Sequence, residues 1–294
     1  MIDYNTIVLG AGISGISCAI YLKRAGIKVL LVEGNIPGGQ LNKASVIENY
    51  PGYVSIGGSD LSMMLLNQVQ SNDIDMVYDM VSDIDYDKKI VTIGVAKYSY
   101  KYLVIATGRR ERVLGLEQEN SLIGRGISLC ATCDGALYKD KYVVVVGGGA
   151  SAVSEALYLS NIVNKVYLVY RGNKLKAEDV MIRRVKDTNN IEVIYEANVV
   201  EYKMDDSKLC GVKLDSGREI VCDGVFLAIG YVPNSEIFIG KKNDGYIVVD
   251  EYGKTSIDNV YACGDVIEKK VYQLVTASSE GVLVASSIIR NNNS

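Results

Sequence analysis

The sequence contains no histidine and no tryptophan among its 294 residues, and it has only three prolines and two phenylalanines. The absence of histidine excludes a histidine general base and any zinc site built from cysteine and histidine together. A four-cysteine zinc site would need a second close pair, but among the six cysteines only Cys130 and Cys133 are close in sequence. We therefore expect no metal site.

Long apolar runs are also missing, and no charged leader with a cleavage site precedes the first apolar segment, which begins MIDYNTIVLG. The net charge of −4 does not favour a nucleic-acid partner. These observations predict a cytoplasmic protein with neither membrane nor nucleic acid as a partner. Its length is sufficient for two domains. Structural disulfides are rare in the cytoplasm, so we expect four of the cysteines to be buried small side chains: Cys18, Cys210, Cys222 and Cys263.

The other two cysteines lie in the stretch SLCATCDGALY, residues 128–138. Their spacing allows a disulfide between Cys130 and Cys133, and C-x-x-C in a cytosolic protein is typical of a redox-active dithiol. Asp134 follows directly and is the adjacent candidate for a proton donor in a chain without histidine. Two unrelated thiols and a helix-capping aspartate are the alternative interpretation.

The N-terminal segment has the pattern of a dinucleotide-binding unit. An apolar strand runs into Gly10-x-Gly12-x-x-Gly15, a helix follows, and a second strand ends on Glu33. Gly10 permits a tight turn, Gly12 allows the backbone to approach a pyrophosphate, and Gly15 allows helix and strand to pack closely. Glu33 is placed to accept hydrogen bonds from ribose hydroxyls. The segment therefore predicts dinucleotide binding.

A second copy of this pattern begins at Lys141, where a strand leads into Gly147-x-Gly149-x-x-Ala152, a helix and another strand. Two Rossmann units and a C-x-x-C motif in one chain suggest a flavin, a nicotinamide-type site and a disulfide in series. A Rossmann scaffold that has lost its ligand is the alternative for the second copy. The predicted fold class is α/β, with two Rossmann-like units.

Apolar strands elsewhere also end in small or polar residues. Residues 101–110 contain Thr107 and Gly108 at the end of a buried-type strand, and residues 259–266 end in Gly264 and Asp265. Asp265 is placed to bond a cofactor hydroxyl or a group next to a phosphate; a simple turn aspartate is the alternative.

Together these motifs resemble the low-molecular-weight thioredoxin reductase family over nearly the whole chain. The motifs that carry the resemblance, in order, are GAGISG, GGQL, ENYPG, ATG, CATCDG, GGGASA, IGYVPN and ACGDV. The resemblance implies a two-dinucleotide-binding flavoprotein with three-layer ββα domains, in which FAD is the cofactor, thioredoxin the partner and a homodimer the assembly. It implies a discontinuous FAD-binding domain, 1–112 plus 242–294, and a central NAD(P)-like domain, 113–241, that carries the disulfide.

The resemblance also implies roles for individual residues. Cys133 corresponds to the thiol near the flavin, Cys130 to the thiol that attacks the substrate disulfide, and Asp134 to the proton donor. FAD contacts are implied, in addition to the glycines and acids above, for Gly39, Gln40, Leu41, Asn49, Thr107, Gly108, Gln273 and Leu274.

The chain departs from the NADPH-using pattern of the family. The clamp for the 2′-phosphate keeps Arg171 and has Lys176 in place of another arginine. Tyr231 and Tyr272 replace a histidine and an arginine of the pattern, and we expect one of these rings to cover the flavin face where a nicotinamide would lie. The nucleotide contacts Gly147, Gly149, Ala152, Arg171 and Lys176 are thus either functional or vestigial.

These departures favour reduced ferredoxin over NADPH as the electron donor. An NADPH-dependent enzyme with a degenerate clamp and a dithiol oxidase that uses oxygen are the alternatives. Ferredoxins are acidic, so a basic docking patch is expected. Two clusters are candidates: Arg109, Arg110, Arg112 and Arg125, or Arg183, Arg184 and Lys186.

Overall fold

The computed structural model describes residues 2–44, 46–206 and 208–293, and the chain folds as two compact units. Unit 1 comprises Met1–Arg110 and Val232–Ser294, and unit 2 comprises Glu111–Tyr231. The second unit is therefore inserted into the first. The chain passes between the units in β7 (Arg109–Glu111) and β16 (Tyr231–Pro233), which pair with each other.

Unit 1 is built on a mixed sheet with the order β3-β2-β1-β6-β5-β4, in which β19 also pairs with β6. Its strands are β1 (Ile2–Leu9), β2 (Val29–Glu33), β3 (Asp75–Tyr78), β4 (Val81–Asp85), β5 (Ile90–Ile93), β6 (Ala96–Ile105) and β19 (Val260–Ala262). The pairs around β1, β2, β3, β6 and β19 are parallel, and β4, β5 and β6 form antiparallel pairs. The carboxyl ends of β1, β2, β6 and β19 thus lie at one edge, where ligands bind in such sheets.

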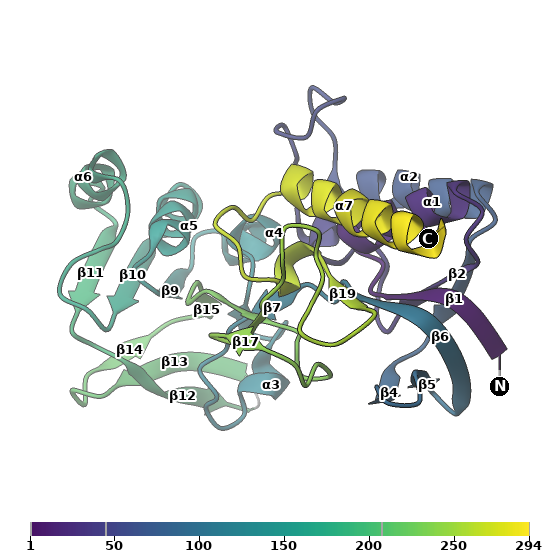
Figure 1. Cartoon of the computed structure of the whole chain (residues 1–294). Helices are drawn as coiled ribbons and strands as arrows, with labels where there is room; N and C mark the ends of the chain where they lie inside the picture. The colour runs from purple at the N-terminus through teal and green to yellow at the C-terminus, as the bar shows by residue number, and fades with distance from the viewer. Residues whose placement is uncertain (1, 45, 207, 294) are drawn as a thin grey trace. The chain divides into compact units, whose positions relative to one another are not determined.

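Successive side chains along a strand point to opposite faces of the sheet, so the strands of unit 1 contribute to two hydrophobic cores. Val8 faces the core formed with the helices, whereas Ile7 and Leu9 face the opposite core. Figure 1 shows α1 (Ile13–Arg24), α2 (Gly58–Ser71) and α7 (Leu274–Asn293) together over the sheet. Close contact between α1 and α7 needs a glycine, because a Cβ at Gly281 would lie 2.1 Å from the carbonyl oxygen of Ser14.

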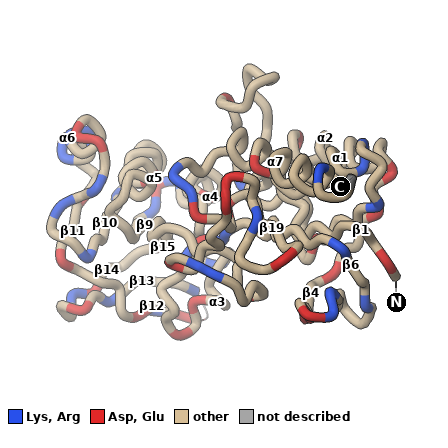
Figure 2. The backbone as a smooth tube through the Cα atoms, viewed as in Figure 1, with Lys and Arg blue, Asp and Glu red and all other residues tan. Residues whose placement is uncertain are grey.

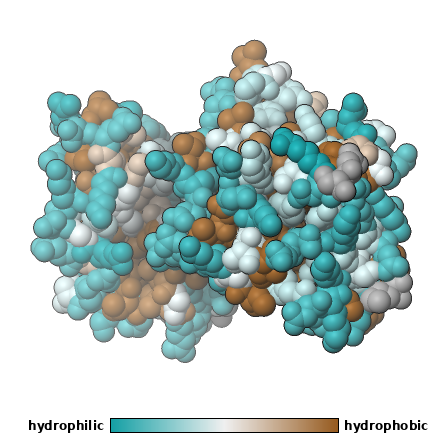
Figure 3. Space-filling model, viewed as in Figure 1, coloured by the Kyte–Doolittle hydropathy of each residue, from teal (hydrophilic) through white to brown (hydrophobic). Residues whose placement is uncertain are grey.

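Smaller elements complete unit 1: η1 (Gly39–Lys43), β17 (Lys242–Asn243), β18 (Tyr246–Ile247) and η3 (Gly264–Val266). The loop between η1 and α2 projects from the unit, and its tip is apolar in Figure 3. Val54, within this loop, is 95% exposed.

Unit 2 contains a parallel sheet with the order β11-β10-β9-β15-β8 and an antiparallel sheet with the order β12-β13-β14. The first is formed by β8 (Ile127–Ser128), β9 (Tyr142–Val146), β10 (Lys165–Tyr170), β11 (Ile191–Tyr195) and β15 (Gly224–Leu227), and the second by β12 (Val199–Asp205), β13 (Lys208–Leu214) and β14 (Glu219–Val221). The helices are α3 (Glu119–Leu122), α4 (Ala131–Asp134), η2 (Gly135–Tyr138), α5 (Ala150–Ser160) and α6 (Asp179–Asp187).

The run of valines in β9 joins the layers of unit 2. Val143 and Val145 pack against α5 and α6, whereas Val144 and Val146 pack against the antiparallel sheet. This is a three-layer ββα arrangement, so the predicted α/β fold with Rossmann-like units is confirmed. Among the helices that the structure describes, none combines the length and the apolar character that a membrane span requires.

Candidate active site

The glycine-rich turn of unit 1 has the backbone that a dinucleotide needs. Gly10 has a φ of +107°, and a Cβ there would lie 2.4 Å from the carbonyl oxygen of Ala106. A Cβ at Gly15 would lie 1.9 Å from the carbonyl oxygen of Gly10, so only glycine lets α1 approach the turn. A Cβ at Gly12, by contrast, would meet nothing within 4 Å, because this position faces open space. The backbone therefore requires glycine at Gly10 and Gly15 and leaves space at Gly12.

Glu33 ends β2 beside this turn. Its Oε2 accepts a hydrogen bond from the backbone N–H of Ala11 (2.8 Å), and its Oε1 accepts one from Asn35 (2.9 Å). The carboxylate is therefore fixed next to the backbone that would hold a pyrophosphate.

A cavity of about 960 Å³ opens at this edge of the sheet, entirely within unit 1. Its walls include most of the predicted cofactor residues: Gly10, Gly12, Glu33, Gly39, Gln40, Leu41, Thr107, Gly108, Asp265, Gln273 and Leu274. Asn49 adjoins the wall, because its Nδ2 donates to Oε1 of Gln273 (3.2 Å). Gly15 and Gly264 shape the backbone behind the wall, where Gly264 donates its N–H to Glu280 (2.9 Å).

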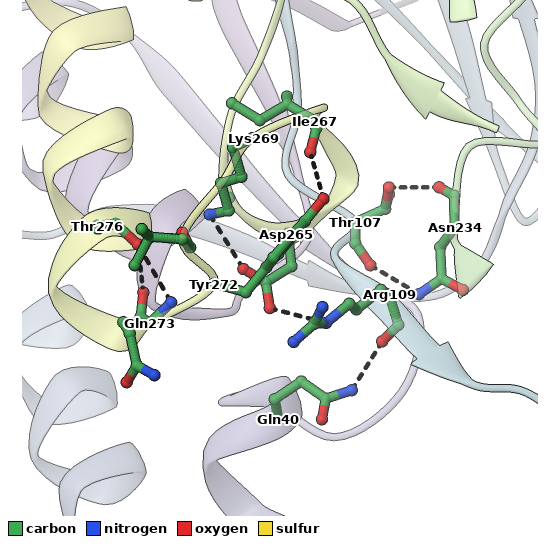
Figure 4. A network of polar contacts seen from close by, with 12 residues as sticks. Gln40, Thr107, Arg109, Asn234, Asp265, Ile267, Lys269, Tyr272, Gln273 and Thr276 are labelled. Atoms are coloured by element: carbon green, nitrogen blue, oxygen red, sulfur yellow. Dashed lines mark hydrogen bonds and ion pairs between the residues drawn. The ribbon is translucent and has the colours of Figure 1, made fainter. Parts of the chain in front are cut away.

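One end of the cavity is lined by a charged network (Figure 4). Asp265 lies between Arg109 and Lys269, with N···O distances of 3.2 and 3.1 Å. Lys269, only 9% exposed, also pairs with Glu280 (2.9 Å). Burial raises the pKa of Glu280, while Lys269 and the N–H of Gly264 act in the opposite direction.

Tyr272 covers part of this network. Its ring centroid lies 4.2 Å from the guanidinium carbon of Arg109 and 5.2 Å from Nζ of Lys269, and the ring of Tyr246 lies 5.7 Å away. Two cations beside one ring hold that ring in place. Tyr272 therefore lines the cavity, whereas Tyr231 is the last residue of unit 2.

The network was not apparent from the sequence. Arg109 was a candidate for a surface patch, but its side chain is only 18% exposed and forms an ion pair with Asp265. Its carbonyl oxygen accepts a hydrogen bond from the side chain of Gln40 (2.7 Å). Arg110 is likewise paired with Glu236 (2.7 Å). Lys269 and Glu280 gave no sequence signal, because neither lies in a motif.

The residues of the cavity fit FAD. Its volume is within the range of about 300–1,000 Å³ found for cofactor pockets. Gly12 leaves open space at the N-terminus of α1, where backbone N–H groups and the helix dipole favour a pyrophosphate. Buried Leu41 and half-buried Leu274 supply apolar wall, and the N-terminus of α7 begins beside Gln273.

The C-x-x-C motif of unit 2 forms a disulfide between Cys130 and Cys133. Cys130 is the N-cap of α4, and its Sγ accepts a hydrogen bond from the N–H of Cys133 (3.2 Å). The motif thus lies at the start of a helical turn. Among the described residues, no cluster of three or more metal-ligating side chains is present.

Asp134 is held in place by a residue that sequence analysis did not assign. The hydroxyl of Ser128 donates to Oδ2 of Asp134 (2.8 Å) and accepts from the N–H of Cys130 (3.1 Å). Ser128 ends β8 and is 3% exposed. The only signal for it was its position at the start of the quoted motif.

The glycine-rich turn of unit 2 repeats the backbone of the first. Gly147 has a φ of +141°, a Cβ there would lie 2.3 Å from the carbonyl oxygen of Ala228, and Ala152 is fully buried. Gly149 caps α5 and, like Gly12, faces open space.

The strand end beside the second turn is different. Tyr170 occupies the position of Glu33, and its ring packs on the turn, so that a Cβ at Gly148 would lie 2.3 Å from it. Gly172 contacts the other part of the same ring, and Lys176 donates its backbone N–H to the oxygen of Gly148 (2.7 Å). The side chains of Arg171 and Lys176 are exposed.

A dinucleotide cavity in one Rossmann unit and a C-x-x-C disulfide in a second define a flavoprotein disulfide oxidoreductase. Residues 4–281 match the family described as pyridine nucleotide-disulphide oxidoreductase, and the chain belongs to this family.

Similar proteins narrow the class further. The thioredoxin reductase of Listeria monocytogenes is 38% identical over 97% of this chain and 92% of its own length. The crystal structure of Lactococcus lactis thioredoxin reductase in its FR conformation has a TM-score of 0.85, with 33% identity and 98% coverage of both chains. A ferredoxin-flavin thioredoxin reductase from Clostridium acetobutylicum has a TM-score of 0.56, with 29% identity over 100% of this chain and 99% of that one.

These comparisons confirm the predicted enzyme class, thioredoxin-disulfide reductase, and the predicted cofactor, FAD. They support thioredoxin as the partner substrate.

Proposed function

We propose that this thioredoxin reductase takes its electrons from reduced ferredoxin rather than from NADPH. Tyr170 is the observation that carries the proposal. Its ring covers the glycine-rich turn of unit 2 at the strand end where an acidic residue would bind an adenosine ribose. A ribose bound at this strand end would meet the ring of Tyr170 in place of a carboxylate.

The charges near the second turn also favour this donor. A 2′-phosphate is held best by arginines that bond it in bidentate fashion, and here Gly172 follows Arg171. Lys176 supplies a point charge only, and its backbone is bonded to Gly148. The Clostridium acetobutylicum enzyme indicates that a similar fold serves a ferredoxin-flavin thioredoxin reductase.

A docking surface for an acidic ferredoxin is best supplied by α6. Arg183, Arg184 and Lys186 belong to this helix, along which Figure 2 shows basic residues. Their side chains are exposed, and the ion pairs among the described residues do not include them. The other candidate cluster is weaker, because Arg109 and Arg110 are already paired with Asp265 and Glu236.

The cavity residues named above would hold FAD, whose chemistry when bound would link a one-electron donor such as ferredoxin to a two-electron acceptor such as a disulfide. We assign Cys133 as the thiol nearer the flavin and Cys130 as the thiol that attacks the thioredoxin disulfide. The two electrons and two protons convert that disulfide into two thiols, and Cys130–Cys133 closes again. Asp134 donates the proton to the leaving thiolate, and Ser128 positions its carboxyl group.

The proposal also covers the FAD-binding domain, the cellular location, the assembly and the second glycine-rich turn. FAD binding is assigned to the discontinuous domain predicted as 1–112 plus 242–294, through the cavity residues named above; the compact unit that holds them spans Met1–Arg110 and Val232–Ser294. We further propose that the protein acts as a cytoplasmic homodimer and that the second turn (Gly147, Gly149, Ala152) is vestigial.

Anaerobic flavin absorbance tests the donor. The FAD-loaded protein is mixed separately with NADPH, NADH and enzymatically reduced ferredoxin, and thioredoxin is then added. We expect that, of the three donors, only reduced ferredoxin bleaches the absorbance of the oxidised flavin, and that thioredoxin is then reduced. A sample with the ferredoxin-reducing system but without ferredoxin is the control.

A matched variant separates the two donors. Arg171→Ala/Lys176→Ala should leave ferredoxin-driven turnover within about twofold of the wild type, because exposed charges remote from a reaction contribute little. Rapid bleaching by NADPH, with a KM for NADPH that rises at least about tenfold in this variant, would overturn the proposal.

A further inference from the structure

The order of strands at the carboxyl edge of the unit 1 sheet gives a direction to a dinucleotide bound there. Four neighbouring strands, β2, β1, β6 and β19, are parallel and end at this edge. Glu33 ends β2, Gly10 follows β1, Thr107 follows β6 and Asp265 follows β19. Glu33 and Asp265 are therefore separated by three strand spacings, about 14 Å in total.

This order assigns the two halves of FAD to different strands. The adenosine ribose belongs at Glu33, and the pyrophosphate belongs at Gly12, where α1 begins after β1. The half of the molecule that carries the flavin ring would then extend toward β6 and β19, because the adenosine half occupies the β2 side. That end of the cavity holds the charged network of Figure 4.

Arg109 brings a positive charge to this end of the cavity. Its side chain is part of the cavity wall, and Figure 4 shows its guanidinium group beside Asp265. The two groups are 3.2 Å apart, and the ring of Tyr272 covers the guanidinium at 4.2 Å. The side chain of Gln40 donates to the carbonyl oxygen of Arg109. Contacts from η1, from η3 and from the segment before α7 thus hold this residue in place.

The charges of the network balance only when Arg109 is present. Asp265 pairs with both Arg109 and Lys269, and Lys269 also pairs with Glu280. Two cations therefore face two acids. Loss of the charge of Arg109 would leave an excess of negative charge at the end of the cavity assigned to the flavin ring.

The partner of this guanidinium is itself a departure from the family pattern. Tyr272 stands where the NADPH-using pattern has an arginine, and Arg109 packs against the ring that replaces it. A positive charge is thus present beside position 272, but a different segment of the chain supplies it.

We propose that Arg109 raises the reduction potential of FAD by offsetting the negative charge that the flavin ring gains with electrons. Bound FAD supplies two-electron chemistry, and protein charges near its ring tune the potential. The side chain of Arg109 is largely buried, so water screens its charge little. At an effective dielectric constant of about 20, a unit charge about 8 Å away changes such an equilibrium by more than about tenfold.

This inference rests on the placement of FAD proposed above and does not depend on the electron donor. Potentiometric titration of flavin absorbance tests it, with dithionite as the reductant and an indicator dye of known potential. The FAD-loaded full chain carries Cys130→Ser/Cys133→Ser, so that the active-site disulfide does not titrate. In this background, Arg109→Gln should shift the equilibrium tenfold or more toward oxidised FAD, which is a potential lower by ~30 mV for a two-electron couple.

Two matched variants separate charge from packing. Arg109→Lys keeps the charge beside Asp265 and should stay within about threefold of the parent protein. Arg110→Gln removes the next arginine, which also lines the cavity but pairs with Glu236 and is 53% exposed, and it should shift the equilibrium less than about twofold. An unshifted Arg109→Gln, or an equal shift in either of the other two variants, would overturn the proposal.

A binding cycle gives the same quantity if Arg109→Gln purifies without flavin. The apoproteins of the parent and the variant are titrated calorimetrically with oxidised FAD and, without oxygen, with reduced FAD. By linkage, the ratio of the two dissociation constants changes by the same factor as the reduction equilibrium. We expect the affinity for reduced FAD to fall tenfold or more beyond the affinity for oxidised FAD. Equal losses would overturn the proposal.

A second substitution distinguishes failure of this proposal from failure of the FAD placement. Gly12→Val should lose its flavin if the pyrophosphate lies beside Gly12. A Gly12→Val protein that retains its flavin would overturn the placement and, with it, the role of Arg109. Flavin loss in Gly12→Val together with an unshifted potential in Arg109→Gln would overturn the role of Arg109 alone.

Discussion

The two glycine-rich turns of this chain have the same backbone and different side chains. Gly10 and Gly147 both adopt a positive φ against a neighbouring strand, and Gly12 and Gly149 both face open space. The strand end beside the first turn carries Glu33, bonded to the turn, whereas the second carries the ring of Tyr170, packed on it. The comparison teaches that glycines specify the Rossmann turn, while the residue at the strand end decides whether a nucleotide can use it.

The helices that follow the turns extend the comparison. Six residues after the open glycine, α1 has Cys18 and α5 has Glu155. Cys18 is fully buried in an apolar core, as expected for a small side chain. Glu155 places a carboxyl group at the equivalent position of α5. Because this group is buried, it should make the stability of the protein depend on pH.

The largest effect should come from filling the two open positions. Gly12 and Gly149 both have extended backbone angles that valine tolerates. Gly12→Val should place side-chain atoms in the FAD cradle, so that the protein purifies without flavin and loses at least about 100-fold in thioredoxin reduction. Gly149→Val should keep its flavin and lose less than about twofold with ferredoxin.

Flavin content from the absorbance spectrum and thioredoxin reduction distinguish these variants, and circular dichroism checks that both are folded. Equal loss of activity in Gly149→Val, with flavin retained, would mean that the second turn binds a ligand needed for turnover and would break the comparison.

The strand ends should give an intermediate effect. Glu33→Gln keeps the shape of the side chain and removes its charge, so FAD affinity should fall about tenfold, because a hydrogen bond to a charged group contributes about 1.5–3 kcal/mol. Tyr170→Phe keeps the ring and should change neither FAD affinity nor turnover. Titration of each apoprotein with FAD, followed by flavin fluorescence, measures the FAD affinity of both variants. An affinity change in Tyr170→Phe as large as that in Glu33→Gln would contradict the separate roles of the two turns.

The sequence predicted what local patterns encode. The turn at Gly10-x-Gly12, the strand ends at Thr107 and Asp265, and the three-residue spacing of Cys130 and Cys133 all follow from short segments. Most of the predicted cofactor residues line one cavity, because carboxyl ends of parallel strands share one edge of a sheet.

Contacts between distant segments could not be predicted in this way. Lys269 forms ion pairs with Glu280 and Asp265, and Arg109 also pairs with Asp265. The fold brings these residues together from separate segments of the chain. Cys210 was expected to be buried, yet it lies at a register shift between β12 and β13 and is partly exposed. One sequence has no direct signal for register or for side-chain direction at a strand end.

Glu155 should give the smallest effect, and it concerns stability rather than activity. Within the described part of the chain its Oε2 is buried without a hydrogen-bond partner, and burial, with a contribution from Glu111, raises its pKa to about 7. The folded form therefore holds a proton that the unfolded form releases near the ordinary value of 4.5. Stability contributed by this group is present below about pH 4.5 and is lost as the pH rises to about 7.

Glu155→Gln removes this titration, so the variant should be more stable than the wild type at pH 8 by about 2 kcal/mol, and the difference should shrink at pH 5. Calorimetric unfolding at both pH values measures it. Glu111→Gln is the control: without the neighbouring charge the pKa of Glu155 falls toward its ordinary value, which predicts a smaller gain of the same sign at pH 8. A gain that is equal at pH 5 and pH 8 would mean that the carboxyl group of Glu155 does not titrate in this range. In that case the difference from Cys18 would be one of packing alone.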